Sequence, residues 1–395
     1  MECFAQRLKR IPPYFFAELD QIKKEIKGEI IDFSEGNPDC PTPKPIIQAM
    51  VKALQNPIYH RYPTYQGMLS ARVAVAEWYE QRFGVKLDPE KEVCMLLGAK
   101  EGVAHLIWGV VGNGDKIAVP DPAFPMYYNQ ALLSGGEPII MPLEGKNDFL
   151  PDLAMLHDSK IKLVCLNYPN NPTAAVAPLS FYRDLVERAQ KQGFYIYNDN
   201  VYSEIYFDSP PVSILQAAGA KECCIEFHSL SKTFNMAGWR IGFAVGNSNL
   251  ISAMLKIKQN TDSGPFSAIQ ATAVYALQRA ERFTKSIRSL YKKRRDRLVA
   301  GLNKLGWNVK KPSATFFVWT SLSNRPFPRI GFGKLDPRSA SSSSMAFAKN
   351  LLRQSQIMVA PGVGFGKYGE GYVRFALVVP EIKIKQALKN LKQWH

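Results

Sequence analysis

The sequence predicts an α/β fold with two domains, and three observations support this. Apolar runs typical of buried strands alternate with helical segments from residue 93 to residue 246. One long helical segment over 282–305 then leads to a second group of helices and short strands. The length of 395 residues exceeds what one simple hydrophobic core accommodates. We therefore expect a large α/β domain and a second domain beyond the long helix.

Strands are expected where short apolar runs end at Gly, Pro, Asn or Asp, and helices where apolar residues recur with a period near 3.6. The sequence predicts strands at 30–34, 93–97, 116–119, 138–142, 162–166, 194–197, 223–227, 241–245, 314–320, 357–360 and 372–377. It predicts helices at 45–55, 70–83, 101–111, 179–192, 249–259, 267–277, 282–305, 345–354 and 381–393. Residues 7–18 are interpreted as an irregular arm. The Pro-, Gly- and Ser-rich stretch 324–344 is interpreted as a surface lid or insertion.

Composition limits the class of protein. Apolar residues make up 46% of the chain and aromatic residues 11%, which is typical of a globular enzyme. No apolar run reaches membrane-spanning length, and Met1 to Arg10 lacks the apolar core of a signal peptide. The six cysteines form no C-x-x-C pair, so we expect free thiols in a reducing compartment, the cytoplasm. The five histidines show no metal-ligand spacing, and we expect no metal.

The net charge is +16, and basic residues cluster at 291–297 and along the last helix. A surface of this kind could bind nucleic acid or an acidic membrane. No base-stacking platform or nucleic-acid module accompanies the charge, so we interpret these residues as solvated helix faces. A positive field would also help to attract di-anionic substrates.

The stretch from Ser229 to Gly242 carries the clearest chemical signal. Lys232 lies between two apolar runs, where desolvation lowers a lysine pKa and leaves a neutral amine that attacks carbonyl groups. Ser229, Ser231 and Arg240 supply hydroxyl groups and a planar cation that suit a phosphate monoester. An amine that bonds to an aldehyde beside a phosphate site suggests pyridoxal phosphate. The alternative is a lysine in a surface turn with structural serines.

The complete string, Ser229-Leu230-Ser231-Lys232 followed by Gly238-Trp239-Arg240-Ile241-Gly242, resembles the lysine signature of the class I and II aminotransferases, which are fold-type-I pyridoxal-phosphate enzymes. The resemblance implies a large cofactor-binding domain, residues 46–285, with a mixed, mainly parallel seven-stranded sheet between helices. Residues 1–45 and 286–395 would form a smaller α+β domain. The resemblance also implies a homodimer whose subunits share each active site, with small-molecule substrates and no nucleic-acid or membrane partner.

The cofactor phosphate is assigned to the strand-to-helix turn Gly98-Ala99-Lys100. A glycine at such a turn leaves backbone N–H groups and the positive end of a helix facing an anion. The resemblance adds Ser229 and Arg240 to this phosphate site, with Ser231 as a lesser candidate. It also places a tyrosine, at the position of Tyr62, on the phosphate of the partner subunit.

The pyridine ring is assigned to residues that follow three predicted strands. The family stacks an aromatic residue on the ring at the position of Phe124, although Tyr127 is a rival and core packing is the alternative. Asn171 falls where the family donates to the ring hydroxyl. Asp199 would keep the ring nitrogen protonated, and Tyr202 would meet the ring oxygen. An ordinary Asn-Pro turn, a helix cap and simple packing are the alternatives for Asn171, Asp199 and Tyr202.

The substrate is assigned to two further segments. Arg374 is a lone arginine in an apolar strand and needs an anionic partner, which the family supplies as the substrate α-carboxylate; a salt bridge to a distant acid is the alternative. Asn171 would lie near the same carboxylate. Gly36 belongs to a Pro-rich loop that lines the substrate entrance in the family, or that simply connects elements. Ala174 stands where the family usually has glycine.

These assignments imply ping-pong transfer of an amino group, with Lys232, Asp199 and Tyr202 as catalytic residues. The strings 10–16, 225–229 and 359–372 are most similar to the LL-diaminopimelate aminotransferases, whose members use glutamate as donor. Alanine and aspartate aminotransferases contain closely similar strings and remain alternatives. A pyridoxal-phosphate β-lyase or small-ring synthase, and a non-catalytic regulator with a basic surface, are the rival classes.

Overall fold

The computed structural model describes residues 3–13, 17–158, 160–323 and 343–393. Its centre is a sheet of seven strands in the order β2-β8-β7-β6-β5-β3-β4. Strand β8 runs antiparallel to both of its neighbours, and the other pairs are parallel. The strands are β2 (Val93–Leu96), β3 (Lys116–Asp121), β4 (Glu137–Pro142), β5 (Ile161–Leu166), β6 (Tyr195–Asp199), β7 (Cys224–Ser229) and β8 (Gly242–Gly246). The predicted mixed, mainly parallel seven-stranded sheet is confirmed.

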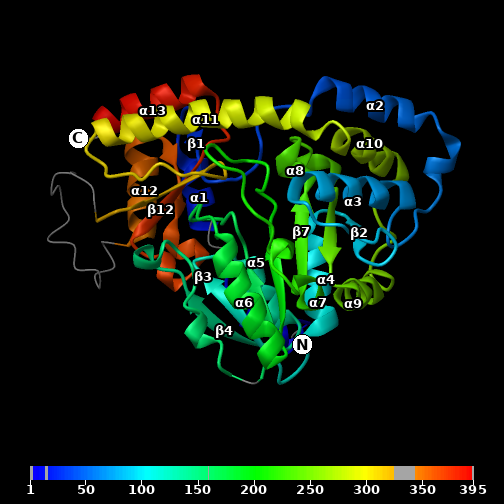
Figure 1. Ribbon diagram of the computed structural model, residues 1–395. Helices are drawn as coiled ribbons and strands as arrows, with labels where there is room; N and C mark the ends of the chain where they lie inside the picture. The colour runs from blue at the N-terminus through cyan, green and yellow to red at the C-terminus, as the bar shows by residue number, and fades with distance from the viewer. Residues whose placement is uncertain (1–2, 14–16, 159, 324–342, 394–395) are drawn as a thin grey trace.

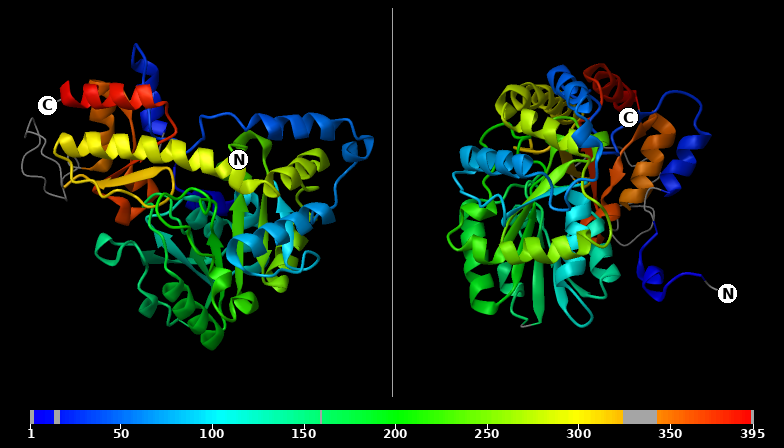
Figure 2. Two further views of the ribbon diagram at one scale, coloured as in Figure 1. Left: turned by 45° about the horizontal axis from the view of Figure 1, so that its top comes forward. Right: turned by 90° about the vertical axis from the view of Figure 1, so that its right-hand side faces the viewer.

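Helices cover both faces of this sheet (Figures 1 and 2). Alternate residues of one strand enter different hydrophobic clusters: Val164 of β5 packs on one face, and Leu163 and Cys165 pack on the other. Because both faces are buried, the strands are continuously apolar. The first face is covered by α3 (Leu69–Phe83), α6 (Leu179–Gln192) and α10 (Ser267–Leu277), and the second by α4 (Ala99–Val110), α5 (Met126–Leu133) and α9 (Ser248–Lys258).

A second group of elements surrounds a separate hydrophobic cluster. Strands β11, β12 and β9 form an antiparallel sheet, and β1 pairs with β10. Figure 1 shows α11 crossing the top of the molecule from α10 towards this group. The group comprises β1 (Ile31–Asp32), α1 (Ala17–Glu25), β9 (Phe317–Ser321), α12 (Ser344–Ser355), β10 (Ile357–Met358), β11 (Ala360–Pro361), β12 (Tyr372–Ala376) and α13 (Glu381–Gln393), with α11 (Ala280–Lys304) beside them.

Four local predictions need correction. The arm at 7–18 contains the short helix η1 (Gln6–Arg10), and α1 begins at Ala17. The strand predicted at 357–360 is two short strands with different partners, and the strand predicted at 314–320 begins at Phe317. Cys223 ends the short helix α7 (Ala220–Cys223), so only Cys224 is in β7. Most of the predicted lid, 324–342, lies outside the described residues.

The parallel strands bring their carboxyl ends to one edge of the sheet. In the register, Gly242 of β8 lies between Leu96 of β2 and Ser229 of β7. The next parallel strand, β6, ends at Asp199 opposite Phe227. The turns that follow β2, β6 and β7 therefore meet at the same edge, which is where ligands bind in open α/β sheets. No helix within the described ranges is long and apolar enough to cross a membrane.

Candidate active site

Lys232 occupies the turn that follows β7. Ser229 ends the strand and caps the short helix α8 (Leu230–Thr233), with its hydroxyl oxygen accepting from the N–H of Ser231 at 3.2 Å. The Lys232 ammonium donates to the carbonyl of Gly36 at 2.7 Å. Burial, and then the positive charges of Arg374 and Arg240, lower the pKa of Lys232 to about 8, and Asp199 opposes this shift. A substantial fraction of the amine is therefore neutral and nucleophilic near pH 8.

Asp199 lies at the carboxyl end of β6 with one oxygen paired and one free. Its Oδ2 accepts a hydrogen bond from the hydroxyl of Tyr127 at 2.6 Å, while Oδ1 is buried without a partner in the described structure. Burial raises the pKa of Asp199 to about 6, against the Tyr127 hydrogen bond and the charges of His228 and Lys232. A buried carboxylate oxygen needs a hydrogen-bond donor or a cation, and a bound ligand with a cationic or N–H group can supply it.

Tyr127 is a site residue whose role the sequence reasoning missed. The sequence indicates it only as a rival to Phe124 for stacking, whereas its ring meets the Phe124 ring edge-on at 6.0 Å between centroids. Phe124 lies just before α5 and Tyr127 lies in its first turn, which brings the two rings close together. Only the fold reveals that the Tyr127 hydroxyl reaches Asp199, 72 residues away.

An anion cradle forms where β2 meets α4. Gly98 has φ +95°, and a Cβ there would lie 2.6 Å from Nη2 of Arg240. The Arg240 guanidinium donates to the carbonyls of Leu97 and Ala237, at 3.2 and 2.8 Å. Among the described residues no side chain caps the start of α4. Its first N–H groups and this guanidinium face the same turn, as a phosphate site requires. Lys100 lies on the same turn, with Nζ 5.6 Å from the Phe124 ring centroid.

Arg374, on β12, is buried without an acidic partner. Its guanidinium donates to Oδ1 of Asn171 at 2.6 Å and to the carbonyl of Ser34, and its Nε has no hydrogen-bond partner among the described residues. Within the described ranges no Asp or Glu forms a salt bridge with it. Phe317 and Phe365 flank the guanidinium at 4.2 and 4.6 Å. Burial lowers the pKa of Arg374 to about 10, because the cation lacks a counter-charge.

The turn that carries Asn171 is anchored to the strand that carries Asp199. The Asn167 amide donates to the Asp199 carbonyl at 2.6 Å and accepts from the Asn171 N–H at 2.8 Å. Ala174, in the same turn, has φ +60°, a left-handed conformation that favours glycine. A glycine would adopt this conformation freely, and Ala174 adopts it at some cost.

The remaining predicted residues divide into two groups. Tyr202 is buried at the site, edge-on to Phe316 at 5.3 Å, and burial raises the pKa of its hydroxyl. Gly36 contacts Lys232 as described. Tyr62 is not brought to this site: it follows the short helix η2 (Pro57–His60), and its side chain is 92% exposed.

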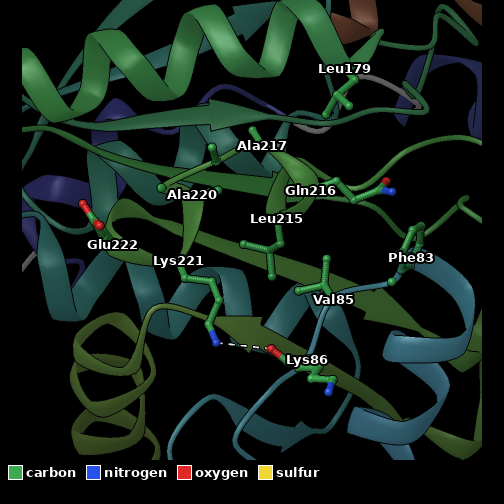
Figure 3. A pocket seen from close by; sticks show the side chains of 13 residues that line it. Phe83, Val85, Lys86, Leu179, Leu215, Gln216, Ala217, Ala220, Lys221 and Glu222 are labelled. Carbon is green, nitrogen blue, oxygen red and sulfur yellow. Dashed lines mark hydrogen bonds between the residues drawn. The ribbon is translucent and has the colours of Figure 1, made fainter.

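Two other features are separate from this site. A cavity of about 610 Å³ is lined by Phe83, Val85, Leu215 and Ala217, among others (Figure 3). It lies near residues 215–222, before the start of β7, whereas Lys232 follows the end of that strand. Glu101, His105 and Asp262 form a group of possible metal ligands. The buried Lys258 ammonium already donates to both carboxylates of that group, at 3.2 and 2.7 Å.

The residues at the sheet edge fit pyridoxal phosphate. The free Oδ1 of Asp199 offers an acceptor for a protonated ring nitrogen, and the turn at Gly98 offers N–H donors to a phosphate. The amine of Lys232 has a lowered pKa, as bonding to an aldehyde requires.

Comparison with known proteins agrees with this chemistry. The family model "Aminotransferase class I and II" matches residues 28–391. The chain belongs to the class I and II aminotransferases. The LL-diaminopimelate aminotransferase of Aquifex aeolicus is 45% identical, covering 98% of this chain and 99% of that protein. The enzyme of the same name from Halothermothrix orenii is also 45% identical, covering 98% and 97%. Substrate-bound BacF of Bacillus subtilis superposes with a TM-score of 0.91 at 34% identity, covering 100% and 98%. This aminotransferase therefore uses pyridoxal phosphate.

Proposed function

We propose that this aminotransferase transfers the amino group of glutamate to tetrahydrodipicolinate and so forms LL-diaminopimelate. Relatives named for LL-diaminopimelate, 42–45% identical over nearly the whole chain, support this substrate class. The single observation that carries amino-acid binding is Arg374, a buried guanidinium whose neighbours are an amide, a carbonyl and two aromatic rings. Such a cation is best completed by the α-carboxylate of an amino acid.

When bound, the cofactor supplies an aldehyde that takes up the amino group and a ring that accepts electrons from the substrate Cα. In this proposal, Arg374 and Asn171 hold the substrate carboxylate and orient the Cα–H bond. Lys232 Nζ would remove the Cα proton and later return a proton, acting first as base and then as acid. Asp199 keeps the ring nitrogen protonated, and Tyr202 donates to the ring oxygen.

The same proposal assigns the cofactor phosphate to Gly98-Ala99-Lys100, Ser229 and Arg240, with Phe124 against the ring face. The left-handed turn at Gly98 and the two carbonyl contacts of Arg240 support this set, because they fix the donors before the phosphate arrives.

We also propose a homodimer in which Tyr62 completes the phosphate site of the partner. Exposed apolar side chains gather next to this tyrosine, on α2 (Lys44–Leu54) and η2: Ile47, Val51, Leu54 and Ile58. Contiguous apolar surface of this kind marks a protein interface.

The proposal also divides the chain into two domains: residues 46–285 form the cofactor-binding domain, and 1–45 with 286–395 form the smaller domain. All six cysteines are free thiols, which supports a reducing compartment such as the cytoplasm.

The decisive experiment is a panel of amino donors against 2-oxo acid acceptors, including tetrahydrodipicolinate, pyruvate and oxaloacetate. We expect glutamate with tetrahydrodipicolinate to give the highest kcat/KM. Higher kcat/KM with pyruvate or oxaloacetate would instead assign alanine or aspartate transfer. In parallel, Lys232→Ala should lose the visible absorbance band of the bound cofactor and amino transfer; intact transfer in this variant would overturn the role of Lys232.

A further inference from the structure

Asp121 joins the two groups of elements that meet at the active site. It is the last residue of β3 and is buried. Its Oδ2 accepts from the N–H of Lys367 and its Oδ1 from the N–H of Tyr368, both at 2.9 Å. One carboxylate thus caps two successive backbone N–H groups that lie about 246 residues further along the chain.

The neighbouring residues strengthen this junction. The N–H of Ala123, two residues beyond Asp121, donates to the carbonyl of Phe365 at 2.8 Å. Gly366 has φ +125°, and a Cβ built on it would lie 2.2 to 2.6 Å from the three atoms of the Asp121 carboxyl group. The close approach of the two segments therefore requires glycine at residue 366.

The junction connects two parts of the proposed site, in addition to the hydrogen bond between Arg374 and Asn171. On one side, Ala123 directly precedes Phe124, which is assigned to the ring face. On the other side, the Phe365 ring lies 4.6 Å from the Arg374 guanidinium and packs edge-on against Trp319. A shift of the 362–369 segment would therefore move the aromatic wall of Arg374 relative to Phe124.

We propose that Asp121 is a positioning residue, a clamp that fixes the carboxylate-binding guanidinium of Arg374 relative to the cofactor ring face at Phe124. Asp121 touches neither substrate nor cofactor in this role. Its carboxylate holds the 362–369 segment, and the segment holds the wall of Arg374. The proposal rests on the proposed function in one respect, that Arg374 receives the α-carboxylate. Loss of the clamp should weaken binding of the substrate carboxylate and leave proton transfer at Lys232 nearly unchanged.

The test uses Asp121→Asn in the cofactor-loaded enzyme. An amide keeps the shape of the carboxyl group but turns an N–H₂ group towards one of the two backbone donors. The matched control is Asp115→Asn. Asp115 accepts a backbone N–H from Gly112 at 3.0 Å, just before the other end of the same strand. Gly366→Ala disturbs the junction from the opposite side. It replaces Asp121→Asn as the test variant if Asp121→Asn does not fold.

Single-turnover absorbance changes with L-glutamate give the dissociation constant and the limiting rate separately. We expect Asp121→Asn and Gly366→Ala to raise the dissociation constant about tenfold, with the limiting rate changed less than about twofold. Asp115→Asn should match the wild type in both. In an Asp121→Ala background, Gly366→Ala should cost less than it does alone, because the clash with the carboxylate is gone.

Amide hydrogen exchange provides a readout that does not depend on activity. Asp121→Asn should accelerate exchange in 362–369 and leave α13 unchanged. Unchanged exchange there, an unchanged dissociation constant for glutamate, or an equal loss in Asp115→Asn would overturn the clamp. A wild-type enzyme that does not react with L-glutamate would count against the proposed function, and the exchange experiment would then decide on the clamp.

Discussion

The hydroxyl of Tyr127 lies 2.6 Å from Oδ2 of Asp199 and donates a hydrogen bond to it. This contact lowers the pKa of a carboxyl group that burial raises to about 6. It also leaves the second oxygen, Oδ1, as the only one available to a ligand in the described structure. Tyr127 therefore helps to keep Asp199 ionised, and it leaves Oδ1 as the oxygen that would face the cofactor ring in the proposed function.

Replacing Tyr127 by phenylalanine should lower kcat/KM about tenfold or more, since a hydrogen bond to a charged group contributes about 1.5–3 kcal/mol. The pKa of Asp199 should rise further. The acid limb of the pH–activity profile should therefore shift to higher pH. Tyr197→Phe is the control, because its ring packs beside Tyr127 at 5.9 Å and its hydroxyl has no hydrogen bond to Asp199. Identical acid-side profiles for the wild type and Tyr127→Phe would contradict the assignment.

The lowered pKa of Lys232 predicts a pH-dependent stability of the cofactor-free protein. Between about pH 8 and the ordinary lysine pKa of 10.5, the unfolded chain binds more protons at this lysine than the folded chain does. The lysine therefore costs stability at neutral pH, and the cost disappears as pH rises through this window. Relative to Lys232→Met, the wild type should gain about 2 kcal/mol in free energy of unfolding between pH 8 and 9.5. Lys285 lies on the exposed face of α11. In denaturant titrations, Lys285→Met should instead show the same pH dependence of the free energy of unfolding as the wild type.

Replacing Arg374 by lysine should raise KM for amino acids about 10- to 100-fold, because the planar pair of N–H donors to a carboxylate is lost. Cofactor absorbance and cofactor affinity should stay near the wild-type values, since Arg374 lies on β12, away from the phosphate turn. Steady-state kinetics and a cofactor titration measure the two effects. A loss of cofactor affinity without a change in KM would place Arg374 in a different role.

The proposed dimer predicts complementation between two inactive variants. Lys232→Ala removes the amine of its own site, and Tyr62→Ala removes the phosphate contact of the partner's site. A hybrid dimer then contains one complete site, so unfolding and refolding an equal mixture should restore about a quarter of wild-type activity at limiting cofactor. Mixtures of each variant with itself are the controls. Absence of recovery in a verified hybrid would exclude a shared site.

Much of this site was predictable because its residues follow strands whose ends the sequence marks clearly. Lys232, Asp199 and the Gly98 turn each follow a short apolar run, and parallel strands must bring their carboxyl ends together. The boundaries of 267–277 and 381–393 agree with the structure, since apolar periodicity defines long amphipathic helices well.

Contacts between distant segments could not be predicted in the same way. The buried Arg294 binds both carboxylate oxygens of Asp39 at 2.7 and 2.8 Å, although the basic run around Arg294 was interpreted as solvated. Lys258 is fully buried between Glu101 and Asp262, whereas a lysine near the end of an amphipathic helix is usually exposed. Asp39 and Glu101 lie on distant segments, and local sequence carries no information about which segments those are, although Asp262 is only four residues from Lys258.

The position of β8 has a consequence for how the protein is made. In the described part of the chain, strand β2 lies at the edge of the sheet and pairs with β8 alone, which the ribosome delivers about 150 residues later. A nascent chain that ends before β8 lacks the strand that joins β2, and with it the Gly98 turn, to β7. If the Gly98 turn and Ser229 share the cofactor phosphate as proposed, we expect vitamin B6 to be captured only after translation has passed this strand.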